Sequence, residues 1–369
     1  MSNMNFRMSN PSTFKRIMSD RIVALCFLVC VSLFAVSCDN DDNQPSGQYA
    51  EGVFVVNEGN FGSGNGTISH FSESNGATQD LFGLVNNGLA LGDVVQSMTI
   101  DDHVAYIVVN NSKKIEVVDA GTFERIGTIE GLSLPRYVTI KDGFGYVTEW
   151  VGFTDPGQVS VIDLKTNEVT DKITTDAGAE NILENGGLLY VSNNFTNTVS
   201  VIDIEEREVI KTITVASSPG ELLKDVDGKI WVVCGGSYGG NDGALVQIDA
   251  SKSNKPNEES VIKTIALDMN LGFPKATISP DGRNLFYFSG KKVYKFEVTA
   301  SSAPADAFIT ETTATNFYGI GIDRKTDVLY VADDKGFSSS GTVFRYTLSG
   351  PGIDNFTAGI GPGGFAFQD

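Results

Sequence analysis

Histidine and cysteine are scarce in this sequence, and sustained helical periodicity is missing from residue 51 onward. The 369 residues include two histidines and four cysteines. His70 and His103 lie in or beside expected strands, and neither belongs to a G-x-S-x-G or H-E-x-x-H arrangement. The cysteines and histidines also lack the spacing of a zinc site. These shortages argue against a serine hydrolase, a zinc hydrolase and a zinc-stabilised fold.

Basic residues are also in deficit, with 27 Lys and Arg against 46 Asp and Glu and a net charge of −19. Such an acidic chain is unsuited to nucleic acid and to anionic membrane surfaces, but it tolerates neutral, zwitterionic or cationic ligands. Two glycine-rich runs, residues 59–66 and 235–243, lack the Lys-Ser/Thr pair and the helix that follow a phosphate-binding loop. We therefore expect no nucleic-acid partner and no phosphate-binding loop.

Long hydrophobic runs are limited to residues 22–36, which are 15 residues long and follow Lys15, Arg16 and Arg21. This run is too short for a membrane span and has the form of a secretory signal. Met18 is an alternative start to Met1. The run ends in F-A-V-S-C, which resembles a bacterial lipobox with Ala35 where the pattern usually has Leu. An ordinary secreted protein cut near Ser37 is the alternative.

The acidic residues 39–42 resemble the surface-export signal of Bacteroidota lipoproteins. We therefore predict a lipoprotein signal peptide over residues 1–37, lipidation of Cys38, and a lipidated acidic tether over residues 38–50. Cys26 and Cys30 would leave with the signal, so that Cys234 remains without a disulfide partner. A buried, inert thiol is the expected state of Cys234.

One sequence pattern of short apolar runs and turns is repeated along the chain. Residues 188–215 contain three short runs rich in Val, Ile and Tyr with tight turns between them, and residues 107–129 and 145–173 are near copies. If each repeat is read as four strands, seven runs fit its second strand, and these runs end at intervals of about 40 to 55 residues. That spacing is the length of a four-stranded propeller blade. We predict an all-β fold, a seven-bladed β-propeller over residues 51–369 with four antiparallel strands, A to D, in each blade. The C-terminal residues 364–367 supply strand A of the first blade and close the ring.

Aspartates end several of the expected C strands and suggest two readings. The four are Asp119, Asp163, Asp203 and Asp249. A metal set is one reading, but an aspartate at a strand end commonly accepts hydrogen bonds from the backbone of the following turn. We predict turn capping. Asp-Gly pairs at Asp142, Asp227 and Asp281 predict tight A–B turns for the same reason.

The B–C and D–A loops of a propeller emerge on one face, around the mouth of the central channel. Here these loops carry aromatic, amide and charged residues, which are suited to stacking on a ligand and fixing its orientation. Lid packing over the blade ends is the plain structural alternative. Phe153, Phe273 and Phe337 lie in the same loops. The candidate ligand-binding residues are Asn57, Glu58, Asn60, Phe61, Asn110, Asn111, Arg136, Tyr137, Glu149, Trp150, Asn193, Asn194, Tyr238, Phe317, Tyr318 and Asp333.

The phrases L-Y-V-S-N-N at residues 189–194 and G-Y-V-T at residues 145–148 resemble the YVTN (YncE-like) propeller repeat. The opening V-N-E-G-N-F-G-S at residues 56–63 is similar to the first blade of Bacteroidota surface lipoproteins of the DUF5074 type. One branch of these, the BtuG branch, captures cobalamin and hands it to a TonB-dependent transporter. The resemblance implies a surface propeller, and corrinoid binding as a property of one branch.

Three functions remain open. The first is a non-enzymatic lipoprotein of the outer membrane that is exposed at the cell surface, binds a nutrient such as a corrinoid on the loop face and assists a TonB-dependent receptor. The second is an adhesion or scaffold propeller that binds a protein or a glycan. The third is a lactonase-like hydrolase that holds a cation near Glu58, Glu149 and Asp333. We expect a monomeric domain, no cofactor and no metal, with contact to the membrane through the lipid anchor alone.

Overall fold

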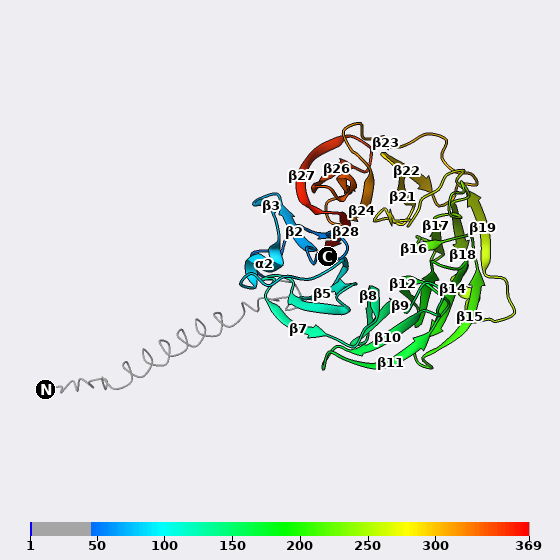
Figure 1. The fold of residues 1–369 in the computed structure, drawn as a ribbon, viewed down its shortest axis with the longest axis horizontal. Coiled ribbons are helices and arrows are strands. Elements are labelled where there is room, and N and C mark those ends of the chain that lie inside the picture. Colours follow the sequence, from blue (N-terminus) through cyan, green and yellow to red (C-terminus); the bar gives the residue numbers. More distant parts are fainter. Residues whose placement is uncertain (2–45, 369) are drawn as a thin grey trace. The chain divides into compact units, whose positions relative to one another are not determined.

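The computed structural model describes Met1 and residues 46–368. Seven four-stranded antiparallel sheets stand around a central channel, so the predicted seven-bladed propeller is confirmed (Figure 1). The predicted signal peptide, Cys38 and most of the tether lie outside the described residues. Tyr49, at the end of the predicted tether, is buried, and its ring lies 5.3 Å from the ring of His70.

In each blade the A strand lies innermost, beside the central channel, and the B strand pairs with it on its outer side (Figure 1). The A strands are β28 (Pro362–Phe367), β4 (Val95–Asp101), β8 (Leu134–Lys141), β12 (Ala179–Asn185), β16 (Pro219–Lys224), β20 (Ala276–Ile278) and β24 (Phe317–Asp323). The B strands are β1 (Val53–Asn57), β5 (Val104–Val109), β9 (Phe144–Trp150), β13 (Leu188–Asn193), β17 (Ile230–Cys234), β21 (Asn284–Ser289) and β25 (Val328–Asp333).

The two outer strands complete each sheet. The C strands are β2 (Thr67–Ser72), β6 (Lys114–Asp119), β10 (Gln158–Asp163), β14 (Thr198–Asp203), β18 (Ala244–Ile248), β22 (Lys292–Glu297) and β26 (Ser340–Thr347). The D strands are β3 (Gly76–Thr78), β7 (Arg125–Ile129), β11 (Glu168–Thr174), β15 (Glu208–Thr214), β19 (Val261–Ala266), β23 (Ile309–Thr310) and β27 (Gly352–Ile360).

Burial along the strands explains their composition. Strands B and C are buried on both faces because each sheet packs between two others, and they read as near-continuous Val, Ile, Leu and Tyr runs. The outermost β11 and β15 each bury one residue, Ile173 and Ile213, and their other residues are partly or fully exposed. The apolar side chains form seven clusters, all of which lie within residues 49–367.

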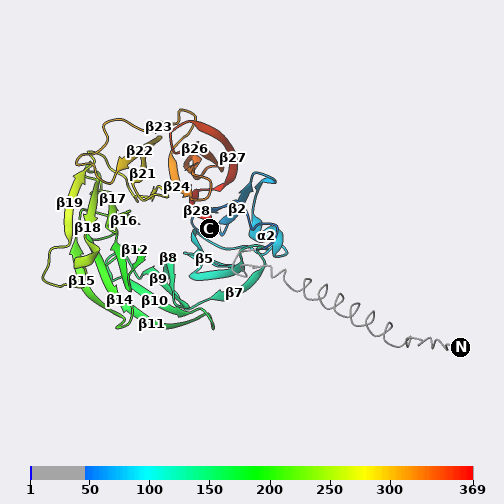
Figure 2. The ribbon, with the colours of Figure 1, turned by 180° about the vertical axis from the view of Figure 1, so that it is seen from behind.

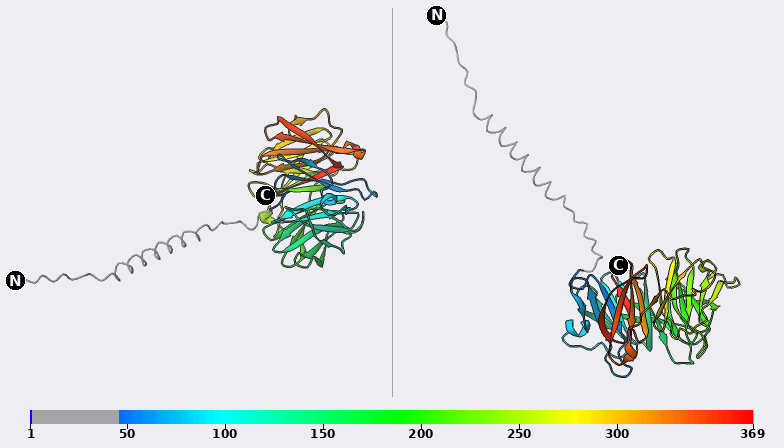
Figure 3. Two further views of the ribbon diagram at one scale, coloured as in Figure 1. Left: turned by 90° about the vertical axis from the view of Figure 1, so that its left-hand side faces the viewer. Right: turned by 90° about the horizontal axis from the view of Figure 1, so that it is seen from above.

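The ring is closed by the C-terminal strand, as predicted. β28 pairs with β1, with Phe367 opposite Val53 and Phe365 opposite Val55 (Figure 2). This pairing removes the open edge that β1 would otherwise present to other chains. The described strands and apolar clusters of the ring all lie within residues 49–367, so residues 46–369 contain the whole propeller (Figure 3).

Turns and short helices complete the fold. Asp119, Asp163, Asp203 and Asp249 each accept hydrogen bonds from backbone N–H groups two or three residues ahead, which confirms the predicted turn capping. A helix that the sequence analysis did not predict, α2 (Leu81–Val85), lies in the loop between β3 and β4. Five residues are too few for a periodic signal. Two 3₁₀ turns are η1 (Ala250–Lys252) and η2 (Lys335–Phe337).

Within residues 46–368, helices are all too short or too polar to cross a lipid bilayer.

Candidate functional site

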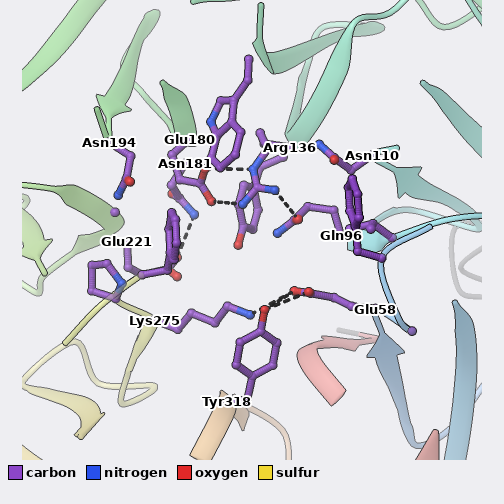
Figure 4. Close-up of a pocket in the computed structure, with 18 of the residues that line it drawn as sticks. Glu58, Gln96, Asn110, Arg136, Glu180, Asn181, Asn194, Glu221, Lys275 and Tyr318 are labelled. Atoms are coloured by element: carbon purple, nitrogen blue, oxygen red, sulfur yellow. Dashed lines mark hydrogen bonds and ion pairs between the residues drawn. The ribbon is translucent and has the colours of Figure 1, made fainter. Parts of the chain in front are cut away.

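A pocket of about 460 Å³ lies where the central channel opens between the B–C and D–A loops. Its wall is built from the starts of the A strands and the ends of the B strands of several blades (Figure 4). The wall holds five charged side chains together with tyrosine, tryptophan, phenylalanine and asparagine. It therefore combines groups that hold polar atoms with flat apolar faces.

Bulges at the start of the A strands aim side chains into this pocket. Six of the seven A–B pairings shift register at that end of the sheet. The residues left without a partner include Gln96, Arg136, Glu180, Glu221 and Tyr318, and all five line the pocket. A bulge bends a strand and turns a side chain out of its regular direction, which makes this placement a consequence of backbone geometry.

On one side of the pocket, Arg136 forms a buried pair with a carboxylate (Figure 4). Its Nε and Nη2 atoms donate to the two oxygens of Glu180 at 2.9 and 2.7 Å, and Nη1 donates to Oε1 of Gln96. The guanidinium carbon lies 4.0 Å from the ring centroid of Trp150. Burial alone would lower the pKa of Arg136, but Glu180 outweighs it and the pKa is raised. Arg136 is therefore a fixed cation.

On the opposite side, Lys275 and Tyr318 converge on Glu58 (Figure 4). The phenol of Tyr318 donates to the Glu58 carboxylate, with oxygen–oxygen distances of 2.8 and 2.9 Å, and Lys275 Nζ lies 3.7 Å from the same carboxylate. Lys275 also donates to the carbonyl of Gly363 at 2.7 Å and lies 4.1 Å from the Tyr318 ring centroid. Burial lowers the pKa of Lys275, although the negative charge of Glu58 partly offsets this by raising it.

Glu221 is the titratable group of the pocket near neutral pH. Burial raises its pKa to about 7, although Lys275 and a hydrogen bond from Asn181 at 3.0 Å oppose the rise. Burial also raises the pKa of Tyr137 and of Tyr318 above the ordinary range, so both phenols stay neutral. The pocket therefore changes charge with Glu221 and presents neutral hydroxyl groups beside it.

The structure brings nine of the sixteen predicted residues into the pocket wall. They are Glu58, Asn60, Phe61, Asn110, Arg136, Tyr137, Trp150, Asn194 and Tyr318. Phe273 and Phe337, from the same predicted loops, join them.

Four predicted residues are buried within the blades instead and share one structural position. Asn57, Glu149, Asn193 and Asp333 are paired with the first or second residue of their A strands and accept or donate internal hydrogen bonds. Asn193 donates to Ser200 and Thr198 at 3.0 Å, for example, and the remaining three are bonded to neighbouring serine, threonine or backbone groups. Successive side chains of a strand point to opposite sides, and in three of these four blades the next residue, Glu58, Trp150 or Asn194, lines the pocket.

Three further predicted residues also lie elsewhere. Asn111 donates to Asp93 at 2.5 Å, outside the pocket wall. Phe317 is buried in an apolar cluster while its neighbour Tyr318 faces the channel. Tyr238 lies on the same face of the propeller, in a separate groove.

Sequence reasoning missed several polar residues that complete the pocket. They are Gln96, Glu180, Asn181, Glu221 and Lys275. Each lies at or beside the start of an A strand. Arg136 and Tyr318 occupy the same position in their blades, so alignment of the seven repeats is the signal that finds them.

Residues 51–348 match a family described as Domain of unknown function (DUF5074). The chain belongs to this family. Among curated proteins, none matches this DUF5074 chain.

Solved structures resemble the DUF5074 chain in fold. A quinonprotein alcohol dehydrogenase-like protein from Bacteroides thetaiotaomicron is 16% identical over 87% of this chain and 79% of its own, with a TM-score of 0.66. A functionally unknown protein from Desulfotomaculum acetoxidans is 14% identical over 86% and 98%, with a TM-score of 0.64. The periplasmic gluconolactonase from Pseudomonas aeruginosa is 14% identical over 86% and 99%, with a TM-score of 0.63. At these identities the likeness concerns the propeller fold.

Proposed function

We propose that this DUF5074 protein is a non-enzymatic binding protein that captures a small-molecule nutrient in the pocket at the channel mouth. The observation that carries the proposal is the pocket itself. It joins two buried charge clusters, around Arg136 and Lys275, to the apolar faces of Trp150 and Phe273. A rigid ring that holds such groups in place before binding loses little entropy when the ligand enters.

The surroundings of the pocket support the same proposal. Among the described residues, four aromatic side chains are strongly exposed, and all four line the pocket or the groove beside it: Phe61, Phe153, Tyr238 and Phe273. Exposed aromatic residues gathered on one face mark an interaction surface. A ligand larger than the pocket would extend over them.

A corrinoid is the named candidate ligand. Its flat macrocycle suits the aromatic faces, and its amide side chains suit Glu, Asn, Arg and Lys groups. The similarity of residues 56–63 to surface lipoproteins is the second support. In this proposal Cys38 carries the lipid, the propeller stands at the cell surface, and a TonB-dependent transporter receives the ligand.

Calorimetric titration of residues 46–369 with cyanocobalamin and with cobinamide tests the proposal. We expect one-to-one binding that weakens at least tenfold in Trp150→Ala, a loss of about 1.4 kcal/mol or more. Ile353→Ala removes an exposed apolar side chain on the outer strand β27 and serves as the matched control with unchanged affinity. If neither corrinoid gives a heat of binding or raises the Tm of the protein, a corrinoid is excluded as the ligand.

A lactone hydrolase is the second candidate. A periplasmic gluconolactonase shares the fold, and Glu221 has a pKa of about 7 in the pocket, which suits a general acid or base. Acid release from glucono-1,5-lactone, followed with a pH indicator, tests this function. Turnover that disappears in Glu221→Gln would favour the hydrolase over the binding protein.

A further inference from the structure

A second hollow lies on the same face as the pocket. Its volume is about 1060 Å³, and the residues that line it come from the loops that follow β9, β13, β15, β17 and β19, including residues 194–197, 236–241 and 270–273. None of its fifteen lining residues is charged, although one residue in five of the whole chain is. The neighbouring pocket, with five charged side chains in its wall, has a different chemistry.

Aromatic rings form the apolar part of this groove. Phe153 and Tyr238 are among the most exposed side chains of the described residues, at 79% and 106% of their reference areas. Phe195 lies behind Phe153, with ring centroids 5.5 Å apart, and Phe273 stands between the groove and the pocket. Such rings leave flat apolar faces open to water, and a ligand with a flat apolar face would cover them.

Amide, hydroxyl and backbone groups form the polar part of the groove. Asn197 and Asn241 supply exposed amides, and serine and threonine hydroxyls lie in the same wall, whereas Asn194 and Asn270 already donate to backbone carbonyls. Amides both donate and accept, as do hydroxyl groups, so this set matches a ligand that carries many hydroxyls and no charge.

The loop that carries Tyr238 is held in place by its own hydrogen bonds. Asn270 donates to the carbonyls of Ser237 and Gly240 at 2.8 and 3.1 Å. Asp242 accepts from the backbone N–H of Ser237 at 2.8 Å and from its hydroxyl. The groove wall is therefore formed before a ligand arrives, which reduces the entropic cost of binding.

We propose that this groove binds a neutral saccharide, with sugar rings stacked on Phe153, Tyr238 and Phe273. The alternation of equatorial hydroxyls and apolar C–H faces on a sugar ring fits aromatic faces separated by amides. A charged ligand would find no counter-ion in the groove wall, and a purely apolar ligand would leave the exposed amides of Asn197 and Asn241 without partners. The inference is tested at Phe153 and Tyr238, which lie outside the nutrient pocket, whereas Phe273 and Asn194 line both hollows.

Binding of defined oligosaccharides to residues 46–369 tests the inference. The probes are neutral hexamers of β-glucan, α-glucan, xylan and mannan, with a hexamer of galacturonic acid as the charged comparison and an aromatic-rich peptide as the apolar one. Calorimetry or ligand-detected NMR measures the affinity for each probe.

We expect at least one neutral hexamer to bind, and the affinity to fall about tenfold in Tyr238→Ala and in Phe153→Ala. Both side chains are exposed, so both variants should fold. Ile126→Ala removes an exposed apolar side chain on the outer strand β7 and should leave the affinity unchanged. Failure of all four neutral hexamers, stronger binding of the peptide or the galacturonate, or an unchanged affinity in both aromatic variants would overturn the inference. Loss of corrinoid binding alone would leave it standing.

Discussion

Replacing Arg136 by methionine should destabilise the propeller more than any conservative change on its surface. The guanidinium is buried, bonded to both oxygens of Glu180 and stacked on Trp150. Methionine keeps most of the volume but leaves the Glu180 carboxylate buried without a cation. Breaking a buried ion pair from one side costs about 3–5 kcal/mol.

The size of the effect can be converted to a melting temperature. At about 2 °C for each kcal/mol, the value for larger domains, Arg136→Met should lower the Tm by roughly 6–10 °C. Adding Glu180→Met removes the uncompensated charge, and an apolar pair of similar volume is often about as stable as the ion pair. The double variant should therefore recover most of the loss.

Urea unfolding of residues 46–369 at pH 7.5, with a calorimetric Tm, measures the stability of the parent, Arg136→Met, Glu180→Met and the double variant. The reasoning would be refuted by an Arg136→Met variant within about 1 kcal/mol of the parent, well below the expected cost. It would equally be refuted by a double variant no more stable than the single one.

Other positions give further expectations. Glu221 has a raised pKa, so its contribution to stability is present below the unfolded pKa and is lost as pH rises through about 7. Glu221→Gln should lack this loss and gain about 3 kcal/mol over the parent at pH 8, with little gain at pH 4.5; identical urea midpoints at pH 8 would contradict this. Asn193→Ala should lose about 1–3 kcal/mol through its bonds to Ser200 and Thr198, without any change in ligand affinity. Burial raises the pKa of Cys234 to about 12, so a thiol reagent should label it in denaturant and spare the native protein.

The fold could be predicted because each blade repeats one local pattern. Strand runs of Val, Ile and Tyr separated by Asp and Gly turns recur at blade length, and the C-terminal strand of residues 362–367 was needed to complete the first blade. These signals are local, and the number of blades follows from counting them. Helix α2 was not predicted, because a helix of little more than one turn is too short to show helical periodicity in the sequence.

The site was harder to predict, and the reason is geometric. Pairs such as Asn193 and Asn194 look equivalent in the sequence, yet the pleat sends the first into the blade and the second toward the pocket. The bulges at the start of the A strands then turn residues such as Glu180 and Glu221 toward the channel. Register and bulges depend on how the strands pair. The sequence analysis named loop residues without that pairing, so it could not say which of them face the pocket.

The central claim is that the ligand binds in the pocket at the channel mouth, and the two tryptophans of the chain can test it directly. Trp150 stands in the pocket wall, whereas Trp231 is fully buried in an apolar cluster. Fluorine NMR of residues 46–369 labelled with 5-fluorotryptophan gives one signal for each, assigned with Trp150→Phe. Titration with cyanocobalamin should move the Trp150 signal and leave the Trp231 signal in place. Binding detected by calorimetry with an unmoved Trp150 signal would contradict the account.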